Sequence, residues 1–432
     1  MKCDFVNHSN KSPSPLAFRC WIISDLPTCG HKSKRRLKFK GLFTVSSLII
    51  HIPLTSAARD TTDNPDMDRL YALGARQRNL LIKNQEEWNL YESALILELD
   101  LKSGSVRSCV EYQSPSEVRA HEHSSMVFKA GTIVGNTLYV CTATEVLIFS
   151  LPEFQQTGYV SFPALNDVHH VTPTSDGNLL VANTGLDMVV KLTLQGEVLS
   201  EWAVLDEELW SRFSRDIDYR KVDSTKPHQS HPNFVFELNG ETWVTRFKQR
   251  DAICLDHRSK RIDIAVQSPH DGLICGDRIY FTTVDGRIVI ANTRTLQVDE
   301  IVDLKQVNGS DALLGWCRGI LPLDERRIWV GFTRVRKTKF RENVLWVKNV
   351  FRPGMTEKAT HLALYDIVDR RCLQEFDLEP SGMNIVFSVL PAVPAPPGAI
   401  TTVSTQSSSF WPSVQSPTQE TIPVQCSSMT VQ

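Results

Sequence analysis

Four polar side chains occupy equivalent places in a repeated pattern of the sequence. His170, His231, His270 and Arg318 each stand directly before a short apolar run of the kind that forms a β-strand. Neutral imidazole nitrogens are good ligands for zinc and for iron. If the strands bring these residues to one centre, His170, His231 and His270 are expected to bind a divalent metal ion, zinc or iron.

Neighbouring groups could add acid–base chemistry or bind an anion. Asp167 and His169 lie just ahead of His170, and either is a candidate to transfer protons at the site. The guanidinium of Arg318 is suited to hold a carboxylate or a phosphate. Three alternatives stay open: a catalytic or ligand pocket without a metal, a ring of histidines that hydrogen-bonds backbone groups between strands, and a structural salt bridge of Arg318.

The runs behind these residues repeat a strand–turn–strand pattern. Residues 170–182, 231–244, 270–281 and 318–330 each contain an apolar run, a tight turn and a second apolar run, and a weaker copy spans residues 124–140. Third and fourth apolar runs follow the second. Four strands that recur about every 40 to 60 residues are typical of β-propeller blades, whose inner strands all begin at one end of a central channel.

The ends of the chain determine the number of blades. A sixth inner strand is expected at residues 384–390, with no partner strands after it, while runs at 78–82, 94–100 and 106–112 lack an inner strand. Joining them closes a sixth blade and leaves no open sheet edge. The sequence therefore predicts an all-β, six-bladed β-propeller over residues 66–390 with an N-/C-terminal strand clasp; seven blades are the alternative. Helices are expected only within 66–89 and 206–213.

One blade resembles a known repeat. Residues 176–192 read Asp-Gly-Asn-Leu-Leu-Val-Ala-Asn-Thr-Gly-Leu-Asp and then Met-Val-Val-Lys-Leu, which is similar to an NHL repeat. That superfamily consists of six-bladed propellers and includes lactonase-like hydrolases, strictosidine-synthase-like proteins and zinc-dependent amidating lyases. The amidating lyases bring one histidine from each of several blades to a zinc ion. The resemblance implies comparable roles for His170 and His270, although the fold alone does not fix a function.

Two insertions are expected to cover the histidine-bearing face. Residues 205–228 separate two blades, and residues 334–358 interrupt another and carry eight Lys or Arg against two Glu. Long loops over a pocket commonly act as lids, and the basic excess favours an anionic ligand. A solvated surface loop with an apolar anchor is the alternative for the basic insertion.

Composition excludes several classes of protein. The 432 residues are 41% hydrophobic and 22% charged, and the net charge of −2 predicts no general attraction to nucleic acid. Residues 1–65 are expected to be disordered or an atypical targeting extension, and the Pro/Ser/Thr-rich tail 391–432 to be disordered. No run is long enough to span a membrane. The ten cysteines form no CxxC pair, which favours a cytoplasmic protein; secretion is the alternative if residues 32–58 are a signal.

These observations lead to two hypotheses for function. The first is a β-propeller enzyme with a His-lined axial site, metal-dependent, acting on a small and anionic substrate, with lyase, hydrolase and oxidoreductase chemistry all open. The second is a non-catalytic propeller that binds a peptide or protein partner at the same face. The sequence contains no P-loop, nucleophile-elbow or dinucleotide-binding motif.

Overall fold

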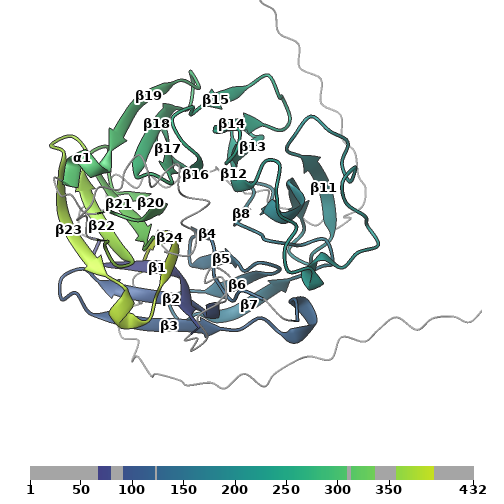
Figure 1. Ribbon diagram of the computed structural model, residues 1–432, viewed down its shortest axis with the longest axis horizontal. Coiled ribbons are helices and arrows are strands. Elements are labelled where there is room, and N and C mark those ends of the chain that lie inside the picture. The colour runs from purple at the N-terminus through teal and green to yellow at the C-terminus, as the bar shows by residue number, and fades with distance from the viewer. Residues whose placement is uncertain (1–66, 79–90, 122–123, 309–312, 336–356, 394–432) are drawn as a thin grey trace, which may run out of the picture. The chain divides into compact units, whose positions relative to one another are not determined.

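The described strands form a closed ring of sheets around a central axis (Figure 1). The computed structural model describes residues 67–78, 91–121, 124–308, 313–335 and 357–393. Their strands are arranged as six four-stranded antiparallel sheets, which confirms the predicted six-bladed β-propeller. No helix in these parts of the chain is long and apolar enough to cross a membrane.

Five blades are each built from one continuous stretch of chain, with the inner strand first. The first blade contains β4 (Gly131–Val134), β5 (Thr137–Cys141), β6 (Val146–Ser150) and β7 (Gln155–Val160). The second contains β8 (His170–Pro173), β9 (Leu179–Asn183), β10 (Met188–Leu192) and β11 (Val198–Ala203). The third contains β12 (Pro232–Leu238), β13 (Glu241–Arg246), β14 (Asp251–Cys254) and β15 (Arg261–Asp263). The fourth contains β16 (Pro269–Cys275), β17 (Arg278–Thr283), β18 (Arg287–Asn292) and β19 (Val298–Asp303). The fifth contains β20 (Trp316–Pro322), β21 (Arg327–Thr333), β22 (His361–Asp366) and β23 (Arg371–Asp377).

The sixth blade joins the two ends of the described chain. β24 (Ile385–Pro391) pairs with β1 (Arg69–Gln77), which continues into β2 (Tyr91–Asp100) and β3 (Val106–Tyr112). One C-terminal and three N-terminal strands thus complete the ring, as predicted. The short helical elements are α1 (Leu304–Asn308) and the 3-10 turns η3 (Ser116–Val118), η4 (Thr184–Leu186), η5 (Tyr219–Lys221) and η7 (Glu379–Ser381).

The structure contradicts the predicted helix at 206–213 and the first part of the one at 66–89, of which residues 79–89 lie outside the described residues. β1 occupies the start of the segment expected to be helical at 66–89, while the strand expected at 78–82 lies almost entirely outside the described residues. β1 is hydrogen-bonded on both edges, to β2 and β24, and most of its side chains are buried. This packing outweighs the helix propensity of its Ala, Leu and Arg residues. Residues 206–213 form turns and bends rather than a helix.

Bulges at the start of three inner strands turn side chains toward the channel. The strand register shifts between Pro232 and Phe234, between His270 and Leu273, and between Cys317 and Ile320. An extra residue in one strand breaks the alternation of side chains and re-aims those beside it. The same ends carry residues with positive φ, namely His231 at 61°, Asp271 at 60° and Gly319 at 75°. The bulges therefore fix how the residues of the site are presented.

Replacing Gly74 with alanine should weaken the clasp. A Cβ at Gly74 in β1 would collide with the backbone carbonyl of Ile385 in β24, so the two strands would have to move apart. We expect the free energy of unfolding to fall by about 1–3 kcal/mol, measured by urea denaturation. Gly158→Ala is the control, because its Cβ would meet only the side chain of Ile148. Equal losses for the two variants would contradict this role of Gly74.

Candidate functional site

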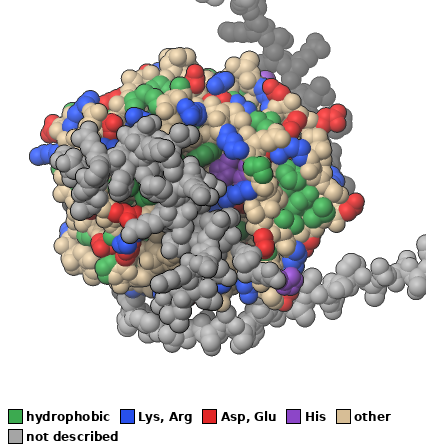
Figure 2. Space-filling model, viewed as in Figure 1, with side chains coloured by type: hydrophobic (Ala, Val, Ile, Leu, Met, Phe, Trp, Pro, Cys, Tyr) green, Lys and Arg blue, Asp and Glu red, His purple; other side chains and the backbone are tan. Residues whose placement is uncertain are grey.

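A cavity of about 610 Å³ lies at the end of the channel where the inner strands begin. Figure 2 shows histidine side chains beside Lys and Arg side chains near the middle of this face. Among the described residues positive charge dominates the lining, and the carboxylates there are those of Asp167 and Asp223. The cationic lining residues are Arg119, Lys129, Arg220, Lys226, Lys248, Arg318 and Arg334. Such an excess of cations attracts a small anion.

Asp167, His228 and His231 form the most compact group of potential metal ligands in the described part of the chain. One ligand atom from each lies within 4.8 Å of the others. The two imidazoles stack, and their Nδ1 atoms are 2.7 Å apart. Oδ2 of Asp167 lies 4.0 Å from Nε2 of His228. Two imidazoles and a carboxylate are the donor set of many zinc and non-haem iron sites.

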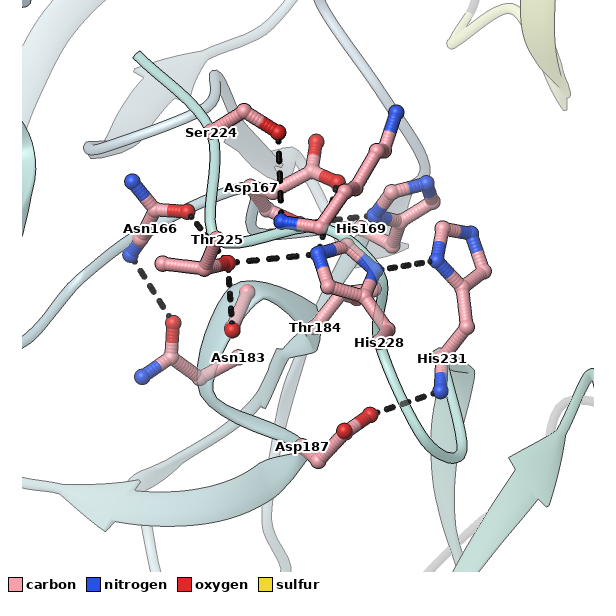
Figure 3. A network of polar contacts seen from close by, with 12 residues as sticks. Asn166, Asp167, His169, Asn183, Thr184, Asp187, Ser224, Thr225, His228 and His231 are labelled. Carbon is pink, nitrogen blue, oxygen red and sulfur yellow. Dashed lines mark hydrogen bonds and ion pairs between the residues drawn. The ribbon is translucent and has the colours of Figure 1, made fainter. Parts of the chain in front are cut away.

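A buried carboxylate holds the backbone that carries the two imidazoles. Asp187, which is fully buried, accepts hydrogen bonds from the backbone N–H groups of Gln229 (2.7 Å), Ser230 (3.0 Å) and His231 (2.7 Å). Arg212 also donates to it, at 3.0 Å. Figure 3 shows Asp187 below the loop that presents His228 and His231. The hydrogen bonds of these four donors to one carboxylate hold the loop in place, although it contains no helix or strand.

Lys129 and His169 bind Asp167 from the other side. The buried ammonium of Lys129 forms an ion pair with Oδ1 of Asp167 and lies 3.4 Å from Nδ1 of His169. Nδ1 of His169 is 2.7 Å from the backbone carbonyl of Asp167. Because a carbonyl can only accept, the proton of a neutral His169 belongs on Nδ1. Its Nε2 then carries the lone pair of a base.

The chain of hydrogen bonds also assigns the tautomers of the two stacked imidazoles. The hydroxyl of Thr225 donates to the carbonyl of Gly185 at 2.6 Å, so it accepts from Nε2 of His228 at 3.2 Å. Nδ1 of His228 is then an acceptor, and Nδ1 of His231 donates to it. This leaves the lone pair of His231 on Nε2. In this arrangement Nε2 of His169 and Nε2 of His231 carry free lone pairs, whereas both nitrogens of His228 are engaged in hydrogen bonds that a bound metal ion would have to replace.

Burial keeps the imidazoles neutral. Burial lowers the pKa of His228, and it lowers the pKa values of His169 and His231 well below the usual range. Nearby cations such as Lys129 lower the pKa of each of the three histidines further. The pKa of Asp167 stays well below its usual value, because Lys129 and other cations outweigh the effect of burial. At neutral pH the group is one carboxylate among neutral imidazoles, which is the state that binds a metal.

Arg318 and His270 lie in another part of the same end of the channel. The guanidinium of Arg318 lines the cavity and packs against the rings of Phe387 and Trp316, at 4.6 Å and 5.6 Å. The structure shows no salt bridge from Arg318 to a described residue. His270 packs against Phe247, which lines the cavity, with ring centroids 5.4 Å apart.

The structure brings together only some of the residues that the sequence indicates. Asp167, His169, His231 and Arg318 line the cavity. His170 does not: its ring stacks on Phe234 at 3.5 Å, and its Nδ1 accepts the backbone N–H of Val235. Consecutive residues at a strand start point to opposite sides, so His169 faces the axis and His170 lies between blades. His170 therefore fits the alternative in which a histidine hydrogen-bonds a backbone group between strands.

Two residues of the group, His228 and Lys129, were not among the predicted site residues, although the sequence places His228 close to them. His228 comes from the first insertion, of which residues 222–228 line the cavity, and the His-x-x-His spacing with His231 is the signal that could have indicated it. Lys129 stands just before β4 in the weakest copy of the repeat, where the pattern places a leading polar residue. His123, which the sequence also offers as a candidate for the channel mouth just ahead of the copy at residues 124–140, lies outside the described residues, as do residues 336–356 of the basic insertion.

Comparisons with known proteins support the fold alone. No family model matches the sequence, and no curated protein matches it. Among solved structures it is similar to a protein of unknown function from Bacteroides caccae, with a TM-score of 0.50, 12% identity, and 75% of this chain and 99% of that chain covered. Chains in a nidogen/laminin complex (TM-score 0.43, 8% identity, 74% and 97% covered) and a mitotic checkpoint complex (TM-score 0.38, 8% identity, 70% and 75% covered) are more distant.

Proposed function

We propose that the axial cavity is the active site of an enzyme that acts on a small anionic substrate with the help of a divalent metal ion, zinc or iron. The observation that carries this proposal is the convergence of Asp167, His228 and His231 in a cavity lined mainly by cations. A concave pocket of about 610 Å³ suits a small molecule. The metal ligands of the proposal thus differ from the set expected from sequence, of which only His231 remains.

The two carboxylate oxygens of Asp167 would have different roles, one in the ion pair with Lys129 and the other as a metal ligand. Oδ1 is engaged by Lys129, whereas Oδ2 faces His228. A tetrahedral ion with bonds of about 2.0–2.1 Å needs ligand atoms roughly 3.3 Å apart. The ligand atoms of Asp167, His228 and His231 now lie within 4.8 Å of one another, so they would have to move closer together to bind the ion.

The surrounding residues would bind the substrate and move protons. A bound ion would polarise the substrate or activate water or oxygen. His169, with its lone pair on Nε2, would take a proton from the reacting group. Lys129 keeps Asp167 ionised and oriented, and the cationic lining draws the anion in. The reaction class stays open among lyase, hydrolase and oxidoreductase chemistry.

The hydrogen bonds that join Thr225, His228 and His231 favour an alternative function, which is acid–base catalysis without a metal ion. Thr225, His228 and His231 are already joined by hydrogen bonds, and Lys129 already neutralises Asp167. The same residues could therefore perform acid–base chemistry without a metal. Binding of a peptide or protein partner at this face is the non-catalytic alternative; the basic insertion on which it rests lies outside the described residues for the most part.

A cytoplasmic location belongs to the same proposal. The six described cysteines, Cys109, Cys141, Cys254, Cys275, Cys317 and Cys372, are free thiols. Such cysteines are usual in reducing compartments. We infer that the propeller domain spans residues 66–390 and works there on a small molecule rather than on nucleic acid.

Elemental analysis of the purified protein tests the metal. We expect stoichiometric zinc or iron in the wild type, and Asp167→Asn and His228→Gln should each weaken metal binding by at least about 10–100-fold. His257→Gln is the control, because His257 is an exposed histidine paired with Glu241. Absence of stoichiometric metal from the wild type, both as purified and after reconstitution, would remove the metal-dependent mechanism and leave the acid–base alternative.

A further inference from the structure

The side chain of Arg318 is partly buried in the cavity wall and forms no ion pair with a described residue, although Asp167 and Asp271 are close enough to act on its charge. Its Nε is inaccessible to solvent and has no hydrogen-bond partner. Burial lowers the pKa of Arg318 to about 10. A partly buried cation with an unmade hydrogen bond is costly to a folded protein. A ligand that supplies the missing acceptors would offset that cost.

A second buried polar atom without a partner belongs to His270, on which the charge of Arg318 acts. This atom is Nε2 of the ring. Burial lowers the pKa of His270 well below the usual range, and the charge of Arg318 lowers it further, so the ring is neutral. The nearby carboxylate of Asp271 is already engaged, by the hydroxyl of Thr282 and the backbone N–H of Gly319.

The surroundings select the type of anion. Arg318 packs against the faces of Phe387 and Trp316, and Phe247 packs against His270. One guanidinium between aromatic rings suits the single negative charge of a carboxylate. The planar guanidinium also matches the two oxygens of a carboxylate.

We propose that Arg318 and His270 form a subsite for a carboxylate group of the substrate. The inference rests on the proposed function, since the carboxylate would belong to the anionic molecule that reacts at Asp167, His228 and His231 in the same cavity. Arg318 would donate two hydrogen bonds to the carboxylate oxygens, and His270 would donate a third. The substrate class is then a small carboxylic acid rather than a phosphate ester.

Binding of trifluoroacetate, followed by fluorine NMR line broadening, tests the subsite. We expect wild-type protein to broaden the signal, acetate to reverse the broadening, and Arg318→Met to weaken trifluoroacetate binding by about tenfold or more. Arg371→Met is the control: it also removes one positive charge, but Arg371 is an exposed residue of β23 that pairs with Asp369 and does not line the cavity. This variant should bind the probe within about twofold of the wild type.

Three results would overturn the proposal: no broadening with the wild type, equal broadening with folded Arg318→Met, or displacement of the probe by inorganic phosphate as readily as by acetate. Thermal unfolding of each variant establishes that it is folded. Asp167→Asn separates the two proposals, because it should lose the metal but still bind trifluoroacetate. In the wild type, trifluoroacetate binding without stoichiometric metal would refute the metal centre alone, and stoichiometric metal without trifluoroacetate binding would refute the subsite alone.

Discussion

Asp187→Asn is expected to destabilise the protein by about 3–5 kcal/mol and to abolish metal binding. Oδ1 of Asp187 accepts the backbone N–H groups of Ser230 and His231, and Oδ2 accepts the backbone N–H of Gln229 and the guanidinium of Arg212. An asparagine amide would turn two N–H donors toward other donors. The loop that presents His228 and His231 would then lose half of its anchors. Urea denaturation measures the first effect and elemental analysis the second.

The backbone at this position makes the substitution a clean test. Asp187 has a φ of 49°, a left-handed conformation that asparagine adopts readily, so the change adds no backbone strain. Asp176→Asn in the same blade is the control, because Asp176 is half-exposed and pairs with Lys191 at the surface. It should cost less than about 1 kcal/mol. Similar losses for both variants would show that the Asp187 cluster does not hold the loop.

Acidification from pH 7 to pH 5.5 is expected to lower the free energy of unfolding by at least about 3 kcal/mol. Burial lowers the pKa values of six histidines in the folded protein: His169, His170, His228, His231, His270 and His361. Below about pH 6.5 the unfolded chain binds protons that the folded chain does not, so stability falls as the pH falls. Asp271 opposes this, since burial raises its folded pKa to about 6.

Denaturation curves at several pH values, together with a single-histidine variant, check this prediction. The pKa of His170 is lowered to about 3, so His170→Gln should reduce the pH dependence by about 1.4 kcal/mol per pH unit between pH 6 and pH 4. His257→Gln, at an exposed histidine, should leave the slope unchanged. Equal stability of the wild type at pH 7 and pH 5.5 would mean that the buried imidazoles become protonated without cost.

The repeat pattern was sufficient to predict the propeller and its closure. Alternation of apolar residues with tight turns is a local property, and Asn239-Gly240 shows why it is readable: both residues have positive φ, at 56° and 77°, as a two-residue hairpin turn requires. β1 was misread because its helix-forming residues carry no local sign that β24, more than 300 residues later, pairs with them.

The site was less predictable because side-chain direction depends on single-residue shifts. His169 and His170 are neighbours, and only the register of β8 decides which one faces the cavity. The bulge after His270 is likewise invisible in the sequence. His228 sits on an irregular loop fixed by Asp187, a residue 41 positions earlier in the chain by sequence number. Contacts of this kind follow from the folded structure and not from local pattern.

Anomalous X-ray scattering from crystals of the metal-loaded protein tests the central claim most directly. Difference maps at the zinc and iron absorption edges should show one peak about 2.0–2.3 Å from ligand atoms of Asp167, His228 and His231. A peak bound elsewhere, or no peak while the Thr225–His228–His231 hydrogen bonds persist, would contradict a metal centre at the mouth of this propeller.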